Sequence, residues 1–193
     1  MKKFTSIILC AVFLLTLCSC GAQTGSGPYE ETTTKPGTEN SATGEAMSND
    51  EYSALLSKLN EDIYAQSVLL SNLGKYINSW WKSYESIGGT ITTEKAMSSA
   101  YEWLEKNSDY TEADITNNHS EIQATYKKII QADNNDRLLL DIAERLKQQY
   151  TNYTEYFSLV TTPGGDRNSF VSDYNEYTQN ISSSYETIGG LLE

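Results

Sequence analysis

The stretch "EYSALLSKLNEDIYAQSVLLSNLGKYINSWWKSYESI" at residues 51–87 decides the fold of this chain. Large side chains recur in it at alternating steps of four and three residues. Because a helix turns once in about 3.6 residues, such a stripe lies on one face of a helix. The stripe predicts one long helix, about 60 Å in length at ~1.5 Å per residue. Its members are Tyr52, Leu56, Leu59, Ile63, Gln66, Leu70, Leu73, Ile77, Trp80, Tyr84 and Ile87.

Local signals mark where this helix begins and ends. Ser48 and Glu51 match a capping box, in which each residue satisfies a backbone N–H of the other. Gly88-Gly89 favours a helix stop, since glycine suits the residue after a helix. A second, shorter helix is predicted from Thr92 to about Asn107, and the turn-rich stretch "NSDYTEADITNNH" at 107–119 indicates a break behind it.

A final helix is predicted after Pro163-Gly164-Gly165, a sequence that ends any preceding helix. Asp166 can cap this last helix, and Gly189-Gly190 is predicted to end it. Its stripe comprises Phe170, Tyr174, Tyr177, Ile181, Ser184 and Ile188. The segments "SYESIGG" at 83–89 and "SYETIGG" at 184–190 are near-identical, and a shared style of helix terminus or an old duplication would each explain them.

The segment Asp133-Asn134-Asn135-Asp136 is ambiguous. Four poor helix formers in a row indicate a turn with a new N-cap. Yet apolar residues continue across it in steps of three and four, which favours one helix from near Ser120 to Thr161. Both readings stay open, and we favour the continuous helix.

No segment alternates between apolar and polar residues with β-branched enrichment, so strands are not expected. The predicted fold is all-α: an antiparallel bundle of three to five helices with coiled-coil-like packing, formed by residues 49–193.

The N-terminal segment "MKKFTSIILCAVFLLTLCSC" has a different character. A basic start precedes an apolar run, Ile7 to Leu17, that is shorter than the ~20 residues of a transmembrane helix. It suits the apolar part of a secretory signal. All three cysteines of the chain, Cys10, Cys18 and Cys20, lie here.

The residues Leu17-Cys18-Ser19-Cys20 resemble the lipobox of bacterial lipoproteins, with Cys18 a mild departure from the usual small residue at that position. The resemblance implies that residues 1–19 are a signal peptide, that cleavage precedes Cys20, and that Cys20 carries the lipid. Two acyl chains suffice for stable membrane anchoring. The resemblance implies that the protein is anchored in a bacterial membrane and faces outside the cytoplasm. The alternative is an ordinary cleaved signal with incidental cysteines.

Residues 20–48 are then the lipidated cysteine and a flexible linker. Gly, Ser, Thr, Glu and Pro dominate from Gly21 to Met47, without periodic apolar residues. About 27 such residues reach roughly 25–30 Å as a random coil.

Composition and motifs argue against several functions. The net charge of −12 opposes nucleic-acid binding, since an acidic surface repels phosphates. The single histidine, His119, cannot form a zinc site with Glu121 alone. We therefore expect no catalytic residue, no metal and no cofactor, and an enzyme that uses carboxylates alone is a third-ranked alternative.

Aromatic side chains are the remaining candidates for binding. Trp80 and Trp81 point about 100° apart on a helix, so one of them flanks the stripe. Tyr156 falls off the stripe formed by Tyr150, Tyr153, Phe157 and Val160, and it is predicted to be exposed. One interpretation is that Trp80 is a core residue, with Trp81 packing on a third helix or facing solvent. The other is that these three residues are exposed anchors, which contact a protein or cell-envelope partner in a non-enzymatic lipoprotein. The alternative is a small-ligand receptor with an aromatic pocket between helices.

Overall fold

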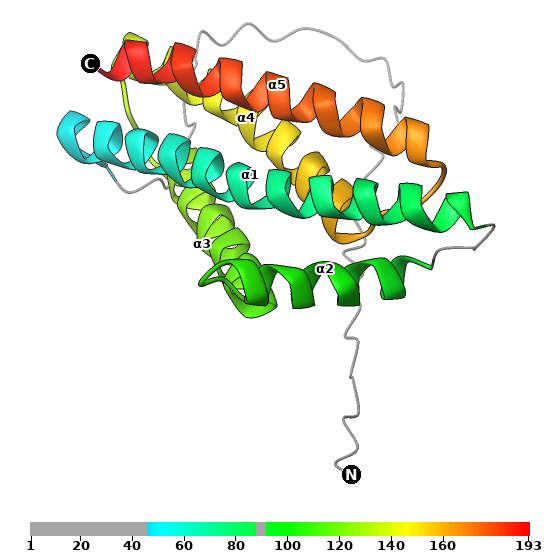
Figure 1. Ribbon diagram of the computed structural model, residues 1–193. Coiled ribbons are helices and arrows are strands. Elements are labelled where there is room, and N and C mark those ends of the chain that lie inside the picture. Colours follow the sequence, from blue (N-terminus) through cyan, green and yellow to red (C-terminus); the bar gives the residue numbers. More distant parts are fainter. Residues whose placement is uncertain (1–45, 88–91) are drawn as a thin grey trace, which may run out of the picture. The chain divides into compact units, whose positions relative to one another are not determined.

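The computed structural model describes residues 46–87 and 92–193, which belong to one compact unit, residues 41–193. Helices hold 86% of the described residues, and no β-strand forms among them. The predicted all-α bundle is thus confirmed, with five helices in the described ranges (Figure 1). They are α1 (Asn49–Ser86), α2 (Thr93–Asn107), α3 (Glu112–Gln131), α4 (Arg137–Thr161) and α5 (Arg167–Leu192).

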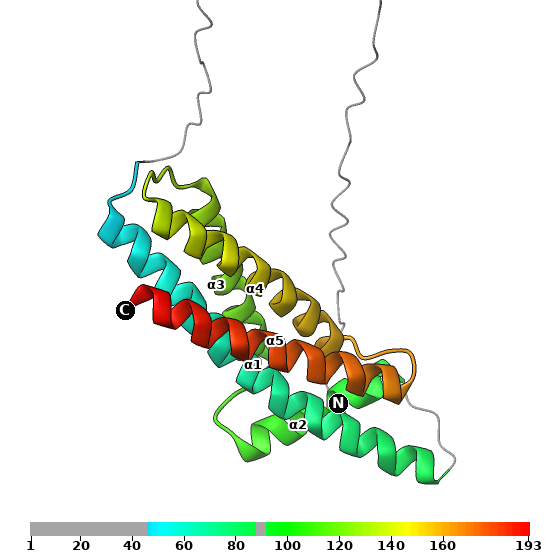
Figure 2. The same ribbon diagram turned by 90° about the horizontal axis from the view of Figure 1, so that it is seen from above.

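The long helix α1 is the axis of the bundle, and it begins at the predicted capping box of Ser48 and Glu51. α5 runs antiparallel beside it, because Asn60 contacts Tyr185 and Asn78 contacts Arg167. Figure 2 shows α4 and α5 together along α1, with α4 parallel to α1. These three helices enclose most of the core.

The chain returns along the other side of α1 in two pieces. α2 pairs with the C-terminal half of α1, where the rings of Tyr76 and Trp103 stack with centroids 5.2 Å apart. α3 pairs with the N-terminal half, where Gln66 donates to the carbonyl of Ile115. Both pieces run antiparallel to α1, and the break predicted within residues 107–119 separates them.

The α1–α5 contact is tight around Gly74. A Cβ atom at this position would overlap the ring of Tyr174. The Tyr174 hydroxyl also donates to the carbonyl of Ser71 at 3.0 Å, which fixes the ring over the glycine. The missing side chain therefore lets the two helices approach closely here.

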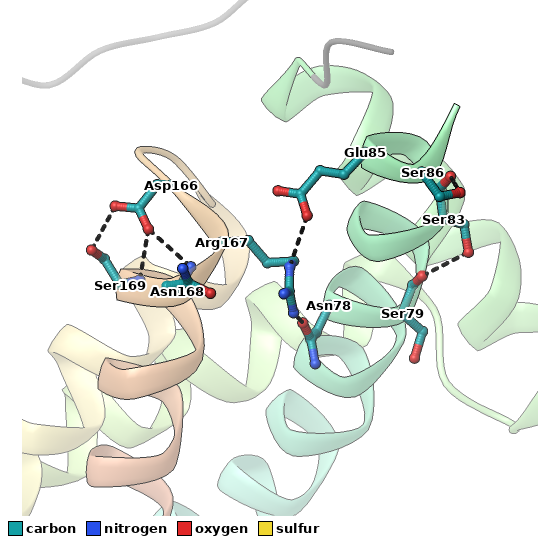
Figure 3. A network of polar contacts seen from close by, with 9 residues as sticks. All are labelled: Asn78, Ser79, Ser83, Glu85, Ser86, Asp166, Arg167, Asn168 and Ser169. Carbon is teal, nitrogen blue, oxygen red and sulfur yellow. Dashed lines mark hydrogen bonds and ion pairs between the residues drawn. The ribbon is translucent and has the colours of Figure 1, made fainter. Parts of the chain in front are cut away.

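A polar network joins the C-terminal end of α1 to the start of α5 (Figure 3). Arg167 Nε donates to Glu85 at 3.0 Å, and its Nη1 donates to Asn78 at 3.1 Å. Asp166 caps α5, as predicted, by accepting the N–H groups of Asn168 and Ser169. The network fixes the first turn of α5 against the last turns of α1.

The favoured continuous helix through Asp133–Asp136 is wrong, since α3 ends at Gln131 and α4 begins at Arg137. Asp136 caps α4, and Asn134 accepts the N–H of Asp136 at 2.8 Å. These side chains satisfy backbone groups that a helix would otherwise pair. The apolar register could not reveal the break, because buried Ile129 and buried Leu139 are ten positions apart, a spacing that one step of four and two steps of three also give in a continuous helix.

The stripe of α1 also shifts near its end. The seven apolar members from Tyr52 to Ile77 are buried, as predicted, but Trp80 and Tyr84 are only half-buried and Ile87 is 77% exposed. A straight helix drifts about 20° per heptad from a repeat of 3.5 residues. After four heptads the neighbouring residue, Trp81, takes the position that packs on the core.

The predicted end of the last helix at Gly189-Gly190 is wrong, since α5 continues to Leu192. Both glycines keep the negative φ of helical backbone. Ile188 is buried and Leu192 packs against the core, so one more turn buries apolar surface at both of its ends. That packing outweighs the low helix propensity of glycine.

Candidate binding groove

The structure does not bring the predicted binding residues together. Cys20 lies outside the described residues. Trp81 packs on the core, with its ring 5.9 Å from that of Phe170. Trp80 is half-buried and lies 4.6 Å from the ring of Tyr84, away from Trp81. The two tryptophan rings therefore pack against different aromatic residues.

The predicted exposure of Tyr156 is wrong, because this residue is fully buried. Its hydroxyl accepts a hydrogen bond from Thr178 of α5 at 3.2 Å, and burial raises the pKa of the phenol. α4 packs against both α1 and α5, so its buried face is wider than one stripe. Tyr156 belongs to the core and is not a surface anchor.

A groove of about 450 Å³ lies on the other side of α1, between α1 and α3 and beside the α2–α3 connection. We call it the α1–α3 groove. Its volume falls in the range of ligand-binding clefts. It is lined by Asp62, Tyr64, Ala65, Gln66, Val68, Leu69, Tyr110, Asn118, Glu121 and Ile122.

The wall of the groove is fixed by the buried side chain of Gln66. Its Nε2 donates to the carbonyl of Ile115 at 3.0 Å, and its Oε1 accepts from Asn118 at 3.2 Å. A buried amide with both ends hydrogen-bonded holds one orientation. The groove is therefore built into the contact between α1 and α3.

Two exposed apolar side chains border the groove. Val68 is 45% exposed and Tyr110 is 41% exposed, whereas most large apolar side chains of the described helices are covered. Leu69 is half-buried beside them, and Ile122 is buried beneath. Exposed apolar groups around a hollow are typical of an interaction site.

The charged residues that line the groove in the described chain, Asp62 and Glu121, are both acidic. Asp62 forms an ion pair with Lys58 of its own helix at 2.6 Å. A second hollow lies on the same α2–α3 connection, and its charged lining residues are Glu105 and Glu112. The break between α2 and α3 thus separates two hollows with acidic linings.

His119 is tied into an aromatic cluster on the far side of α3. Its ring stacks on Phe157 at 3.8 Å, and the Nε2 atom accepts from the Gln123 amide at 2.9 Å. Because that nitrogen accepts, Nδ1 carries the proton and donates to the Tyr153 hydroxyl at 2.9 Å. Burial lowers the pKa of His119, so this cluster favours neutral imidazole. The residue joins α3 to α4 and does not face the groove.

Among the described residues, no group of three or more His, Cys, Asp and Glu side chains is placed to hold a metal ion. In the same part of the chain, none of the helices has the length and apolarity needed to cross a membrane. Comparison of the chain with protein-family models, curated proteins and solved structures finds no match in any of the three.

Sequence reasoning singled out the tryptophans and missed the groove, although one signal was present. Val68, Leu69 and Leu70 are three consecutive apolar residues, and they span about 200° of a helix. They cannot all face one narrow core stripe. With Leu70 on the stripe, Val68 had to point elsewhere, and it points to the groove.

Proposed function

We propose that this chain is a bacterial lipoprotein, anchored by lipid on Cys20 outside the cytoplasm, whose helical domain binds a protein or envelope partner without catalysis. The lipobox resemblance at Leu17–Cys20 supports the anchor. Residues 1–19 are removed, residues 20–48 are the anchor and linker, and residues 49–193 carry the binding surface. The partner contacts the α1–α3 groove rather than Trp80 or Trp81.

The observation that carries this proposal is the exposure of Val68 and Tyr110 beside a preformed groove. Burying both side chains under a partner would remove apolar surface from water. This contributes a favourable free energy of about 25 cal/mol for each Å² of apolar surface buried. The fixed amide of Gln66 means that little order is lost when the groove is filled. Both features favour binding of another molecule.

A small-ligand receptor is the second candidate, favoured by the groove volume of about 450 Å³ and its two tyrosines, Tyr64 and Tyr110. Such a ligand would raise the melting temperature of the isolated protein, and the rise would grow with the logarithm of the ligand concentration above its Kd. A protein partner would instead be captured by cross-linking. Screening small molecules by thermal shift therefore separates the two candidates.

Site-directed cross-linking in the native envelope tests the groove. A photoreactive residue at position 110 should capture one partner, and Val68→Lys should abolish that capture. Ile130→Lys is the matched control, since Ile130 is 59% exposed and does not line the groove. Capture that is unaffected by Val68→Lys, or equally lost with Ile130→Lys, would exclude the groove as the site.

The anchor has its own test. Cys20→Ser should block processing or move the protein from the membrane to the soluble fraction, as the thiol that accepts the lipid is gone. Cys18→Ser is the control and should leave processing and membrane retention unchanged. Normal processing and retention of Cys20→Ser would contradict the lipoprotein assignment.

A further inference from the structure

We propose that the α1–α3 groove receives a basic amphipathic segment of a partner protein, with Lys or Arg side chains beside leucine-like ones. This inference rests on the proposed function and specifies the chemistry of the partner. Three features of the described residues support it. The charged lining residues share one sign, apolar side chains line the same groove, and the rim already holds an ammonium group.

The charged side chains that line the groove are of one sign, and the cationic Lys58 lies at its rim. Asp62 and Glu121 line the groove, while Glu105 and Glu112 line the adjacent hollow across the α2–α3 connection. Carboxylates at separate points suit several cationic groups along a segment rather than one compact cation. An acidic partner segment would meet repulsion at each of these points.

Apolar residues line the groove together with the acidic ones. Val68 and Leu69 lie on the face of α1 that borders the groove, and Tyr110 lies at the α2–α3 connection. A purely cationic ligand would leave these side chains without contacts. An amphipathic segment covers them with its apolar side chains, and a cation over the Tyr110 ring adds a favourable contact.

Lys58 shows how the rim holds an ammonium group. Its Nζ lies 2.6 Å from Asp62 Oδ2, and 54% of its side chain is exposed. An exposed pair of this kind contributes little stability, so a cation from a partner can replace Lys58 at small cost. Lys58 therefore occupies the position that a partner's Lys or Arg takes.

Peptide binding tests the inference directly. The protein used is residues 21–193, which retain every helix and every contact described here. The probe is a synthetic helix of Lys and Leu at amphipathic spacing, and its counterpart has Glu in place of Lys. We expect the Lys peptide to bind, and the double variant Asp62→Asn, Glu121→Gln to weaken binding about fivefold or more at low salt.

The matched control removes two charges elsewhere. Asp173→Asn, Glu176→Gln changes exposed carboxylates of α5 by the same amount, and we expect less than about a twofold loss. Val68→Asn should also weaken binding, whereas Ile130→Asn should not. Equal losses for the two charge variants, or equal affinity for the Glu peptide, would overturn the inference. So would competition by spermine that matches the Lys peptide, because spermine has no apolar face.

The two proposals fail in different ways. If Val68→Lys abolishes partner capture in the envelope but Asp62→Asn, Glu121→Gln leaves it intact, the groove binds a partner of other chemistry. The proposed function then stands and the basic segment is excluded. If capture ignores Val68→Lys while the peptide assay gives the expected losses, the groove accepts basic segments but is not the site of the native partner.

Discussion

Two nearly identical segments of this chain have different structures. In "SYESIGG" at 83–89, α1 ends at Ser86 and Ile87 is 77% exposed. In "SYETIGG" at 184–190, α5 continues through both glycines to Leu192, and Ile188 is only 1% exposed. The two segments differ only at Ser86 and Thr187, so what each isoleucine can pack against decides whether the helix continues.

The neighbours of the two segments explain the difference. Ile188 lies where α5 faces α1 and α4, and Leu192, one turn later, also packs on the core. Ile87 follows the point where the stripe of α1 has drifted off the core, and only Trp81 still packs there. α1 therefore ends where its stripe has left the core, and α5 continues where further apolar surface is buried.

The largest expected change in stability comes from substituting the isoleucine of each segment. Ile188→Ala should lower the free energy of unfolding by about 2–5 kcal/mol, because it leaves a cavity in a covered site. Ile87→Ala is the matched control and should change it by less than about 0.5 kcal/mol. Urea denaturation followed by circular dichroism measures both. Similar losses for the two variants would show that packing does not distinguish the segments.

Replacing a glycine of the second segment should instead increase the stability. Gly190→Ala should raise the free energy of unfolding by about 0.5–1 kcal/mol, since alanine has the higher helix propensity and a Cβ there meets nothing within 4 Å. Gly74→Ala is the contrasting control, because its Cβ would overlap the ring of Tyr174. Thermal denaturation measures both, and a destabilising Gly190→Ala would mean that the last turn is not helical in solution.

Much of this fold could be predicted from the sequence, because periodicity and caps are local properties. The long helix, the capping box at Ser48, the break within residues 107–119 and the cap at Asp166 all agree with the structure. The errors share one cause. Continuity at Asp133–Asp136 and at Gly189-Gly190 depends on packing and side-chain hydrogen bonds that a periodic pattern does not contain.

The candidate site was harder to predict, because it arises from a contact between distant segments. Tyr110 and Val68 are 42 positions apart, and only the antiparallel pairing of α1 and α3 brings them to one groove. Tyr156 was misplaced for a related reason. On α4 the true stripe uses Ile142, Gln149 and Tyr156, and the positions that follow each of these are also suitable for a stripe. Sequence spacing alone does not choose between two such faces.

The smallest expected effect concerns the glutamates of the two segments. Glu85 accepts from Arg167 at 3.0 Å, and Arg167 also donates to Asn78, so this pair joins α1 to α5. Glu186 is exposed, and no ion pair among the described residues includes it. Glu85→Gln should lower the free energy of unfolding by about 0.2–1 kcal/mol, because half-exposed pairs are screened by water. Glu186→Gln is the matched control and should leave it nearly unchanged.

The salt dependence of the stability loss distinguishes an ion pair from a packing effect. At 1 M salt the screening length falls to about 3 Å, so the loss caused by Glu85→Gln should shrink. A double-mutant cycle with Arg167→Gln isolates the coupling between the two side chains from their other contacts. A coupling energy near zero at low salt, or one that high salt leaves unchanged, would mean that the pair does not hold the end of α1. The end of α1 would then depend on the packing of Trp81 on Phe170 and on the hydrogen bond from Arg167 to Asn78 for its contact with α5.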